Sequence, residues 1–211
     1  KGHQYYYHLT YKAQLDYQRT FGNHQLSGLG YMFYQNLTKA DVSSPELLPY
    51  NRVNTGIELN YGFANRYFIK AVTGYSASEQ YARNHRYVFT PAVGASWLVS
   101  NERFMEGSKN WLSLLKIRGS WGKTGNDQSG LSRYAYLDNI RQASGGPLAY
   151  LQYLIIEEQT GNPLIQAEIS TKTNLGLDLG LFNAFSLSVD VFKERMENMV
   201  VGATATVPTY Q

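Results

Sequence analysis

Residues 168–191 read EISTKTNLGLDLGLFNAFSLSVDV, and the spacing of apolar residues in them indicates the fold class. Every second residue from Ile169 to Leu181 is apolar or threonine, while the residues between them are polar, charged or glycine. A period of two is typical of a β-strand with two different faces. Phe182-Asn183-Ala184 interrupts the alternation, which resumes from Phe185 to Val191. The stretch therefore predicts two long antiparallel strands joined by a tight turn.

The same alternation occurs in three further pairs of segments, so the sequence predicts eight long strands in four hairpins. Each is longer than the five or six residues that are common in soluble sheets. Between His24 and Tyr34, Gly28 and Gly30 blur the alternation, and the facing of that strand stays open. The expected pairs are 5–18 with 24–34, 53–63 with 67–76, 87–99 with 112–122, and 169–181 with 185–191.

The connections between these strands alternate between short turns and long polar segments. The turns are residues 22–23, 64–66 and 182–184, and the long segments are 35–51, 79–86 and 123–165. Outer-membrane barrels have this asymmetry, with short periplasmic turns and long extracellular loops, whereas a sandwich has no need of it. We therefore expect an all-β fold, an antiparallel up-and-down transmembrane β-barrel. The alternative from the pattern alone is a water-soluble antiparallel sheet with one solvated face.

Aromatic residues lie near both ends of the apolar strand faces, as they do at the two interfaces of a membrane. From Tyr67 to Tyr75 is roughly 26 Å along a strand, or about 20 Å of height after a tilt near 40°. The opposite faces carry charges that a dry core would not accommodate but a water-filled lumen would. The aromatic residues are Tyr17, Phe21, Tyr61, Phe63, Tyr67, Trp97 and Phe185 at the short-turn end, and Tyr5, Tyr7, Tyr75, Tyr87, Phe89 and Trp121 toward the other. The charged residues are Lys12, Asp16, Arg52, Glu58, Lys70, Arg118, Glu168, Lys172, Asp178 and Asp190.

The composition excludes several other classes of protein. Charged residues make up 17% of the 211, with 18 tyrosines and 19 glycines, which is unlike a disordered chain or a charged helical bundle. The net charge of +3 is too small and too dispersed for a nucleic-acid surface, so no nucleic-acid partner is expected. The absence of cysteine excludes disulfides, zinc-thiolate sites and thiol nucleophiles within this sequence. No apolar run approaches the roughly 20 residues of a membrane helix.

Motifs of catalysis and metal binding are incomplete in this sequence. Gly122-Lys123-Thr124 resembles the end of a phosphate-binding loop, but Ile117 stands where its first glycine belongs. The four histidines are scattered without ligand spacing, and Asp127-Gln128-Ser129-Gly130 lacks the downstream glutamate of a calcium loop. We therefore expect no catalytic residue, no metal site, no cofactor and no enzyme activity.

The long segment 123–165 is the expected place of substrate contact, because loops on a rigid scaffold carry recognition. Aromatic planes can stack on sugar rings, and flanking charged and amide groups can form hydrogen bonds with a glycan or a peptide. The alternative is that these tyrosines pack the loop itself or meet a partner that forms a lid. The candidate substrate-binding residues are Tyr134, Tyr136, Tyr150, Tyr153, Arg133 and Arg141.

Three segments of the chain resemble the SusC/RagA family of TonB-dependent outer-membrane transporters from Bacteroidetes. They are Phe89–Trp97 with the following Ser100-Asn101-Glu102 and Phe104-Met105, Leu115–Asp127, and Gly161–Pro163 continuing through Asn174–Asp178 to Leu187–Asp190. Their order and spacing also match, over residues 85–200. Ala167 departs from the family pattern, which has tryptophan just before the glutamate.

The resemblance implies that residues 1–211 are a partial barrel domain from a plugged barrel of the roughly 22-stranded type, with the plug domain and closing strands outside this sequence. It also implies import of oligosaccharides, or of peptides, across the bacterial outer membrane. The implied partners are a SusD-like surface lipoprotein that caps the barrel, the TonB complex that supplies energy through the plug, and outer-membrane lipid around the wall. The alternatives are a small non-transporting outer-membrane barrel of structural or adhesin type and a soluble β-sheet binding module.

Overall fold

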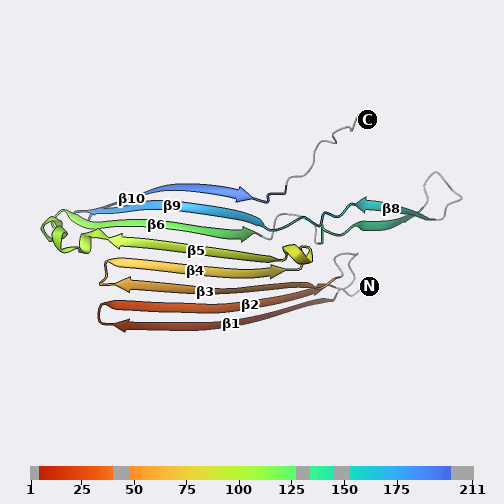
Figure 1. Cartoon of the computed structure of the whole chain (residues 1–211), viewed down its shortest axis with the longest axis horizontal. Coiled ribbons are helices and arrows are strands. Elements are labelled where there is room, and N and C mark those ends of the chain that lie inside the picture. Colours follow the sequence, from red (N-terminus) through yellow and green to blue (C-terminus); the bar gives the residue numbers. More distant parts are fainter. Residues whose placement is uncertain (1–4, 40–47, 127–133, 145–152, 201–211) are drawn as a thin grey trace, which may run out of the picture.

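The computed structural model describes residues 5–39, 48–126, 134–144 and 153–200. Its main feature is one antiparallel sheet of eight strands in the order β1-β2-β3-β4-β5-β6-β9-β10 (Figure 1). The up-and-down order predicted from the sequence is thereby confirmed. Strands β1 and β10 form the two edges, so the described sheet is open. The strands are β1 (Tyr6–Phe21), β2 (His24–Lys39), β3 (Tyr50–Phe63), β4 (Tyr67–Ser78), β5 (Tyr87–Leu98), β6 (Leu112–Asn126), β9 (Glu168–Leu181) and β10 (Phe185–Glu197).

The prediction that segment 123–165 is a loop needs correction. Strand β6 continues to Asn126, and a separate two-stranded hairpin follows, formed by β7 (Asn139–Ser144) and β8 (Tyr153–Gln159). Figure 1 shows this hairpin extending past the end of the large sheet. Backbone groups that leave a sheet still require hydrogen-bond partners, and in this segment they find them in each other. Segment 35–51 is likewise shorter than predicted, because β2 runs to Lys39 and β3 begins at Tyr50.

The large sheet has two chemically different faces. What we call the outward face carries the odd-numbered residues of β1, β3, β4, β5, β9, β10 and, from Leu115 on, β6, together with the even-numbered residues of β2. Its apolar side chains are exposed, for example Leu15 at 76%, Leu175 at 66% and Val191 at 70%. The ten charged residues predicted for the lumen all lie on the opposite, inward face. An apolar face of this extent requires contact with lipid or protein rather than water.

The register settles the facing of β2, which the sequence leaves open. Leu26 lies opposite Tyr61 of β3 on the outward face, which places Tyr31 and Phe33 on the inward face. The Tyr31 ring lies so close to Gly56 of β3 that a Cβ atom on this glycine would overlap the ring. An aromatic ring that covers a glycine on the neighbouring strand is a known means of holding register in sheets. The glycine in β3 therefore makes room for the inward aromatic residue of β2.

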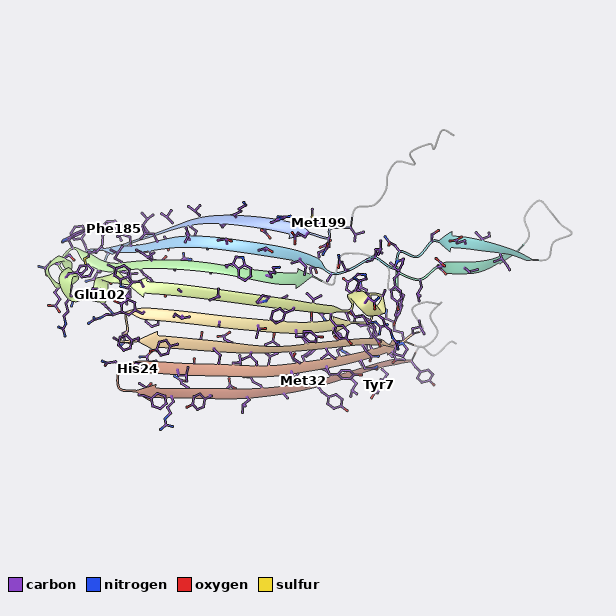
Figure 2. The ribbon with its side chains drawn as sticks, in the orientation of Figure 1. Tyr7, His24, Met32, Glu102, Phe185 and Met199 are labelled. Atoms are coloured by element: carbon purple, nitrogen blue, oxygen red, sulfur yellow. The ribbon has the colours of Figure 1, made fainter. Side chains whose placement is uncertain are left out.

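The helical segments are short 3-10 turns at Arg83–His85, Val99–Asn101 and Arg103–Ser108. In the part of the chain that the structure describes, no helix combines the length and the hydropathy needed to cross a bilayer. Two of these turns, between β5 and β6, lie at the short-turn end of the sheet, the same end as the labelled residues His24 and Phe185 (Figure 2).

Glu102 ties the connection between β5 and β6 to the aromatic residues at the short-turn end. The Tyr67 hydroxyl and the Trp97 indole nitrogen donate hydrogen bonds to its Oε1 at 2.6 and 3.1 Å, and the Arg66 guanidinium lies 3.2 Å from Oε2. The Tyr67 and Trp97 rings stack, with centroids 6.3 Å apart and planes inclined by 14°. Glu102 is only 8% exposed, so its hydrogen bonds are shielded from water. The carboxylate therefore orients the polar tips of two interfacial aromatic residues.

This arrangement predicts that part of the stability of the short-turn end depends on pH. The hydrogen bonds from Tyr67 and Trp97 and the charge of Arg66 lower the pKa of Glu102 below its ordinary value of 4.5, against the opposing effect of burial. A lowered pKa in the folded state stabilises the protein above pH 4.5, and this contribution disappears as the pH falls through the lowered value. We expect Glu102→Gln to unfold at a lower guanidinium concentration than the wild type at pH 7, and the difference to shrink in acid.

The matched control is Glu106→Gln, which removes an exposed carboxylate from the same connection. Its unfolding midpoint should follow the wild type at both pH values. A gap between wild type and Glu102→Gln that stays constant from pH 7 to pH 3 would contradict the assigned role of the carboxylate.

Candidate functional site: the inward face and the outer segment

A shallow hollow of about 550 Å³ lies over the inward face of the sheet. Seven strands contribute to it, from Gln18 on β1 to Asn174 on β9. The inward residues that line it are mainly polar or small, and the inward cationic side chains among them are Lys70, Lys116 and Arg118. A polar concave wall of this kind suits contact with water, with a polar solute or with another polar protein surface.

Arg118 is the centre of a charged network that joins β6, β9 and β10. Its Nη2 donates to Asp190 Oδ2 at 2.7 Å, and its Nε donates to Asp178 Oδ2 at 3.1 Å. Asn174 Nδ2 donates to Asp190 Oδ1 at 2.9 Å, and the Ser188 hydroxyl donates to Asp178. One guanidinium thus compensates two carboxylates that would otherwise repel each other across adjacent strands.

A second inward network joins β2, β3 and β4. Lys70 Nζ lies 2.7 Å from Glu58 Oε1, and Asn60 Nδ2 donates to the same oxygen at 3.0 Å. Asn60 Nδ2 is also within 3.3 Å of Ser27 Oγ on β2. The charged groups of these two networks are therefore paired across strands, which keeps this part of a polar lumen wall ordered at little electrostatic cost. The sequence predicts that these residues share a face but does not pair them, because pairing depends on register.

Of the six candidate substrate-binding residues in the outer segment, which is the part of the chain between β6 and β9, Tyr134 and Tyr136 lie side by side in the described structure. Tyr134 is buried, and its hydroxyl donates to the Pro49 carbonyl oxygen at 2.6 Å. Tyr136 is half-buried, with its ring edge toward Tyr134 at 6.1 Å between centroids. Tyr134 therefore anchors the segment to the β2–β3 connection, as the packing alternative predicts. The other four are placed as follows: Arg141 lies in β7, Tyr153 lies in β8 opposite Ser144, and Arg133 and Tyr150 lie outside the described residues.

Gly161 holds the two ends of the outer segment together. Its backbone nitrogen donates to Asp138 Oδ1 at 2.7 Å, and the nitrogen of Asn162 donates to the Ala135 carbonyl at 3.1 Å. A Cβ atom on Gly161 would stand 2.6 Å from the Tyr136 carbonyl oxygen and 2.7 Å from the Asp138 nitrogen. In the sequence, Gly161 belongs to a segment that resembles a family motif, and the local pattern does not indicate a physical role for it. The role is close backbone approach, which any side chain would prevent.

Across 5–39, 48–126, 134–144 and 153–200, histidine, aspartate and glutamate side chains do not gather in groups of three or more that could hold a metal ion. The segment Gly122-Lys123-Thr124, which resembles part of a phosphate-binding loop, lies inside strand β6.

Comparison with known proteins places the chain among outer-membrane barrels. The family model described as TonB dependent receptor-like, beta-barrel, matches residues 2–211. The chain is 26% identical over 221 residues to TonB-dependent receptor P3 of Formosa agariphila, covering 88% of this chain and 21% of that protein. It is also 26% identical over 203 residues to TonB-dependent receptor SusC of Bacteroides thetaiotaomicron, covering 85% of this chain and 20% of that protein. The chain thus spans about a fifth of the length of these relatives.

Solved structures support the same fold. The RagAB peptide transporter gives a TM-score of 0.76 at 21% sequence identity, covering 94% of this chain and 25% of that chain. The RagAB peptide importer in its open-open state gives a TM-score of 0.69 at 22% identity, covering 96% of this chain and 24% of that chain. The matched relatives are receptors and transporters rather than enzymes.

Proposed function

Because the chain belongs to the TonB-dependent receptor-like β-barrel family, we propose that it forms part of the wall of a transporter that imports a nutrient through its lumen. The family locates the sheet in the bacterial outer membrane. In this proposal residues 1–211 are a partial barrel domain, and the plug domain and closing strands belong to the rest of the polypeptide. The TonB complex acts on that plug and opens a path along the inward face.

The observation that carries the proposal is the separation of the two faces of the sheet. The outward face exposes apolar side chains along every strand, and the inward face carries paired charges over a polar hollow. A structural barrel of eight strands would fill its lumen with side chains. The described sheet instead leaves a concave polar wall, which favours a wider barrel with a wet interior.

The substrate class is proposed to be an oligosaccharide, with a peptide as the second possibility. One relative is SusC, and the structural neighbour RagAB is described as a peptide transporter. The outer segment would present its aromatic and charged groups at the loop end of the barrel, where a SusD-like lipoprotein would close over the substrate. Tyr136 supports this proposal, because it is partly exposed and held in place by the buried Tyr134.

Two measurements test the proposal. The mass of the intact polypeptide, measured under denaturing conditions, should be several-fold above 23.9 kDa. Its sequence should contain a plug domain. Deletion of the gene should abolish growth on one oligosaccharide or peptide mixture while growth on the corresponding monosaccharide or free amino acids continues. A native mass near 23.9 kDa would instead favour a small non-transporting barrel. Unchanged growth on all oligosaccharides and peptides tested would also count against transport.

A further inference from the structure

Cationic residues lie on the outward face of β6 and β10, at the end of the sheet opposite the short-turn end, which we call the loop end. The outward residues of β10 are apolar from Phe185 to Val191, and the next two are Lys193 and Arg195. On β6, Trp121 is followed on the same face by Lys123. These cations are odd-numbered residues, whereas Arg118 and Asp190 on the same strands are even-numbered and face inward. Because successive residues of a strand point to opposite faces, the cations lie on the lipid side.

The register brings these residues into two adjacent rows across three strands. In the first row Thr173 of β9 lies between Trp121 and Lys193, and in the second row Thr171 lies between Lys123 and Arg195. Adjacent strands are about 4.8 Å apart, so the backbones that carry the two outer residues of each row are separated by roughly 10 Å. The two rows together make a surface of one indole, two hydroxyls and three cations, which we call the outer basic surface. It lies toward the end of the sheet where Met199 is labelled in Figure 2.

The charges of this surface are only partly neutralised within the described part of the chain. Neither Lys123 nor Lys193 forms an ion pair with any described carboxylate. Arg195 forms an ion pair through its Nε with Glu197, the next outward residue of β10, at 3.1 Å, and its side chain remains 75% exposed. Three cations thus face one carboxylate on this part of the outward face. Lys172 and Glu194, the nearest charged pair on the two strands, lie on the opposite face. The outer basic surface therefore carries net positive charge.

The position of this surface relative to the membrane decides what can contact it. Lys193 follows the apolar Val191 by two residues, roughly 7 Å along the strand, so the cations begin where the apolar band ends. Trp121 in the first row is an interfacial aromatic residue. The β2–β3, β4–β5 and β6–β9 connections are at this end, and the tight turns β1–β2, β3–β4 and β9–β10 are at the other, which favours this end as the extracellular side. The outer leaflet there consists of phosphorylated glycolipid, and clustered Lys and Arg beside a membrane bind anionic headgroups.

We propose that the outer basic surface binds the phosphorylated sugar headgroup of an outer-leaflet glycolipid. Lys123, Lys193 and Arg195 contact the phosphate oxygens, Thr171 and Thr173 donate hydrogen bonds, and the Trp121 ring packs against the sugar or the first acyl carbons. The long Lys and Arg side chains reach upward to the headgroup while their stems lie on the apolar band. This lipid site is independent of the nutrient path, because it lies on the opposite face of the wall.

The test compares lipid binding by the purified full-length protein and by its double variant K193Q/R195Q. Native mass spectrometry with bis-phosphorylated lipid A should show at least tenfold weaker binding to the variant than to the wild type. Dephosphorylated lipid A should bind both proteins equally weakly. Millimolar inorganic phosphate should not displace the lipid, which distinguishes a lipid headgroup from a free phosphate as the ligand.

Two control proteins keep the test decisive. R19Q/K109Q removes two positive charges near the short-turn end and should bind bis-phosphorylated lipid A like the wild type. K193R/R195K keeps the charge of the outer basic surface and should also retain binding, and circular dichroism checks that every variant is folded. The proposal is overturned if folded K193Q/R195Q binds bis-phosphorylated lipid A like the wild type, or if R19Q/K109Q loses as much affinity.

Discussion

Leu177→Arg in the full-length protein is expected to lower the free energy of unfolding by about 2–4 kcal/mol, because it places a charge near the midplane of the lipid face. Leu177 is centrally placed on the outward face, where it lies opposite Ile117 of β6 and Val189 of β10. These neighbours are apolar, so the guanidinium would have no carboxylate beside it on that face. A guanidinium titration of the protein folded into lipid vesicles measures the loss.

Two control variants separate the face of the sheet from the effect of the substitution itself. Ser120→Arg introduces the same side chain into the polar hollow of the inward face, and its effect should be much smaller. Asp178→Asn should also be mild, because the amide can still accept hydrogen bonds from Arg118 and Ser188 in a partly hydrated network. If Leu177→Arg and Ser120→Arg were equally destabilising, the assignment of outward and inward faces would be wrong.

Gly161→Ala is expected to detach the two ends of the outer segment from each other. The added Cβ atom would lie 2.6 Å from the Tyr136 carbonyl oxygen and 2.7 Å from the Asp138 nitrogen, and backbone atoms cannot rotate away. Overpacking of this kind costs about 1–3 kcal/mol, which corresponds to an increase in the open population of the segment by a factor between about 5 and about 150. Cleavage by trypsin after Arg133 or Arg141 should accelerate by a similar factor.

The control for this prediction is Gly107→Ala at the opposite end of the molecule. A Cβ atom on Gly107 would meet nothing within 4 Å, so its cleavage rate and stability should equal those of the wild type. Equal trypsin sensitivity of Gly161→Ala and Gly107→Ala would show that the backbone approach at Gly161 does not hold the segment. Tyr136 depends on the same contact, so a detached segment should also weaken uptake of the transported nutrient.

The regular part of the fold could be predicted because it depends on local alternation. In β9, for example, Leu175, Leu177 and Leu179 alternate with small or polar residues, and a strand places such residues on opposite faces whatever its neighbours are. The turn at Phe182-Asn183-Ala184 follows from the interruption of that pattern, and the structure has positive φ at Phe182 and Asn183. The outward and inward faces, and the residues that carry charge inward, were predicted on this basis and are confirmed.

The hairpin formed by β7 and β8 was missed because its signal is weak. Strand β7 has six residues and β8 has seven, and the run Tyr153-Leu154-Ile155-Ile156 does not alternate. The facing of β2 was left open for a similar reason, since Tyr31 and Phe33 are aromatic residues on the polar face. Their facing makes sense only with Gly56 of the neighbouring strand in place.

The number of long strands in the large sheet and their up-and-down order can be predicted from the sequence alone. The same is true of the family and of which face of the sheet is apolar, because each of these depends on alternation within a strand or on short motifs. The structure is needed to show which residues meet across strands: Arg118 with two aspartates, Glu102 with Tyr67 and Trp97, Gly161 with the backbone near Tyr136, and the cations beside Trp121. Such contacts depend on register, and a shift of one residue between strands would change every pair while leaving the alternation within each strand the same.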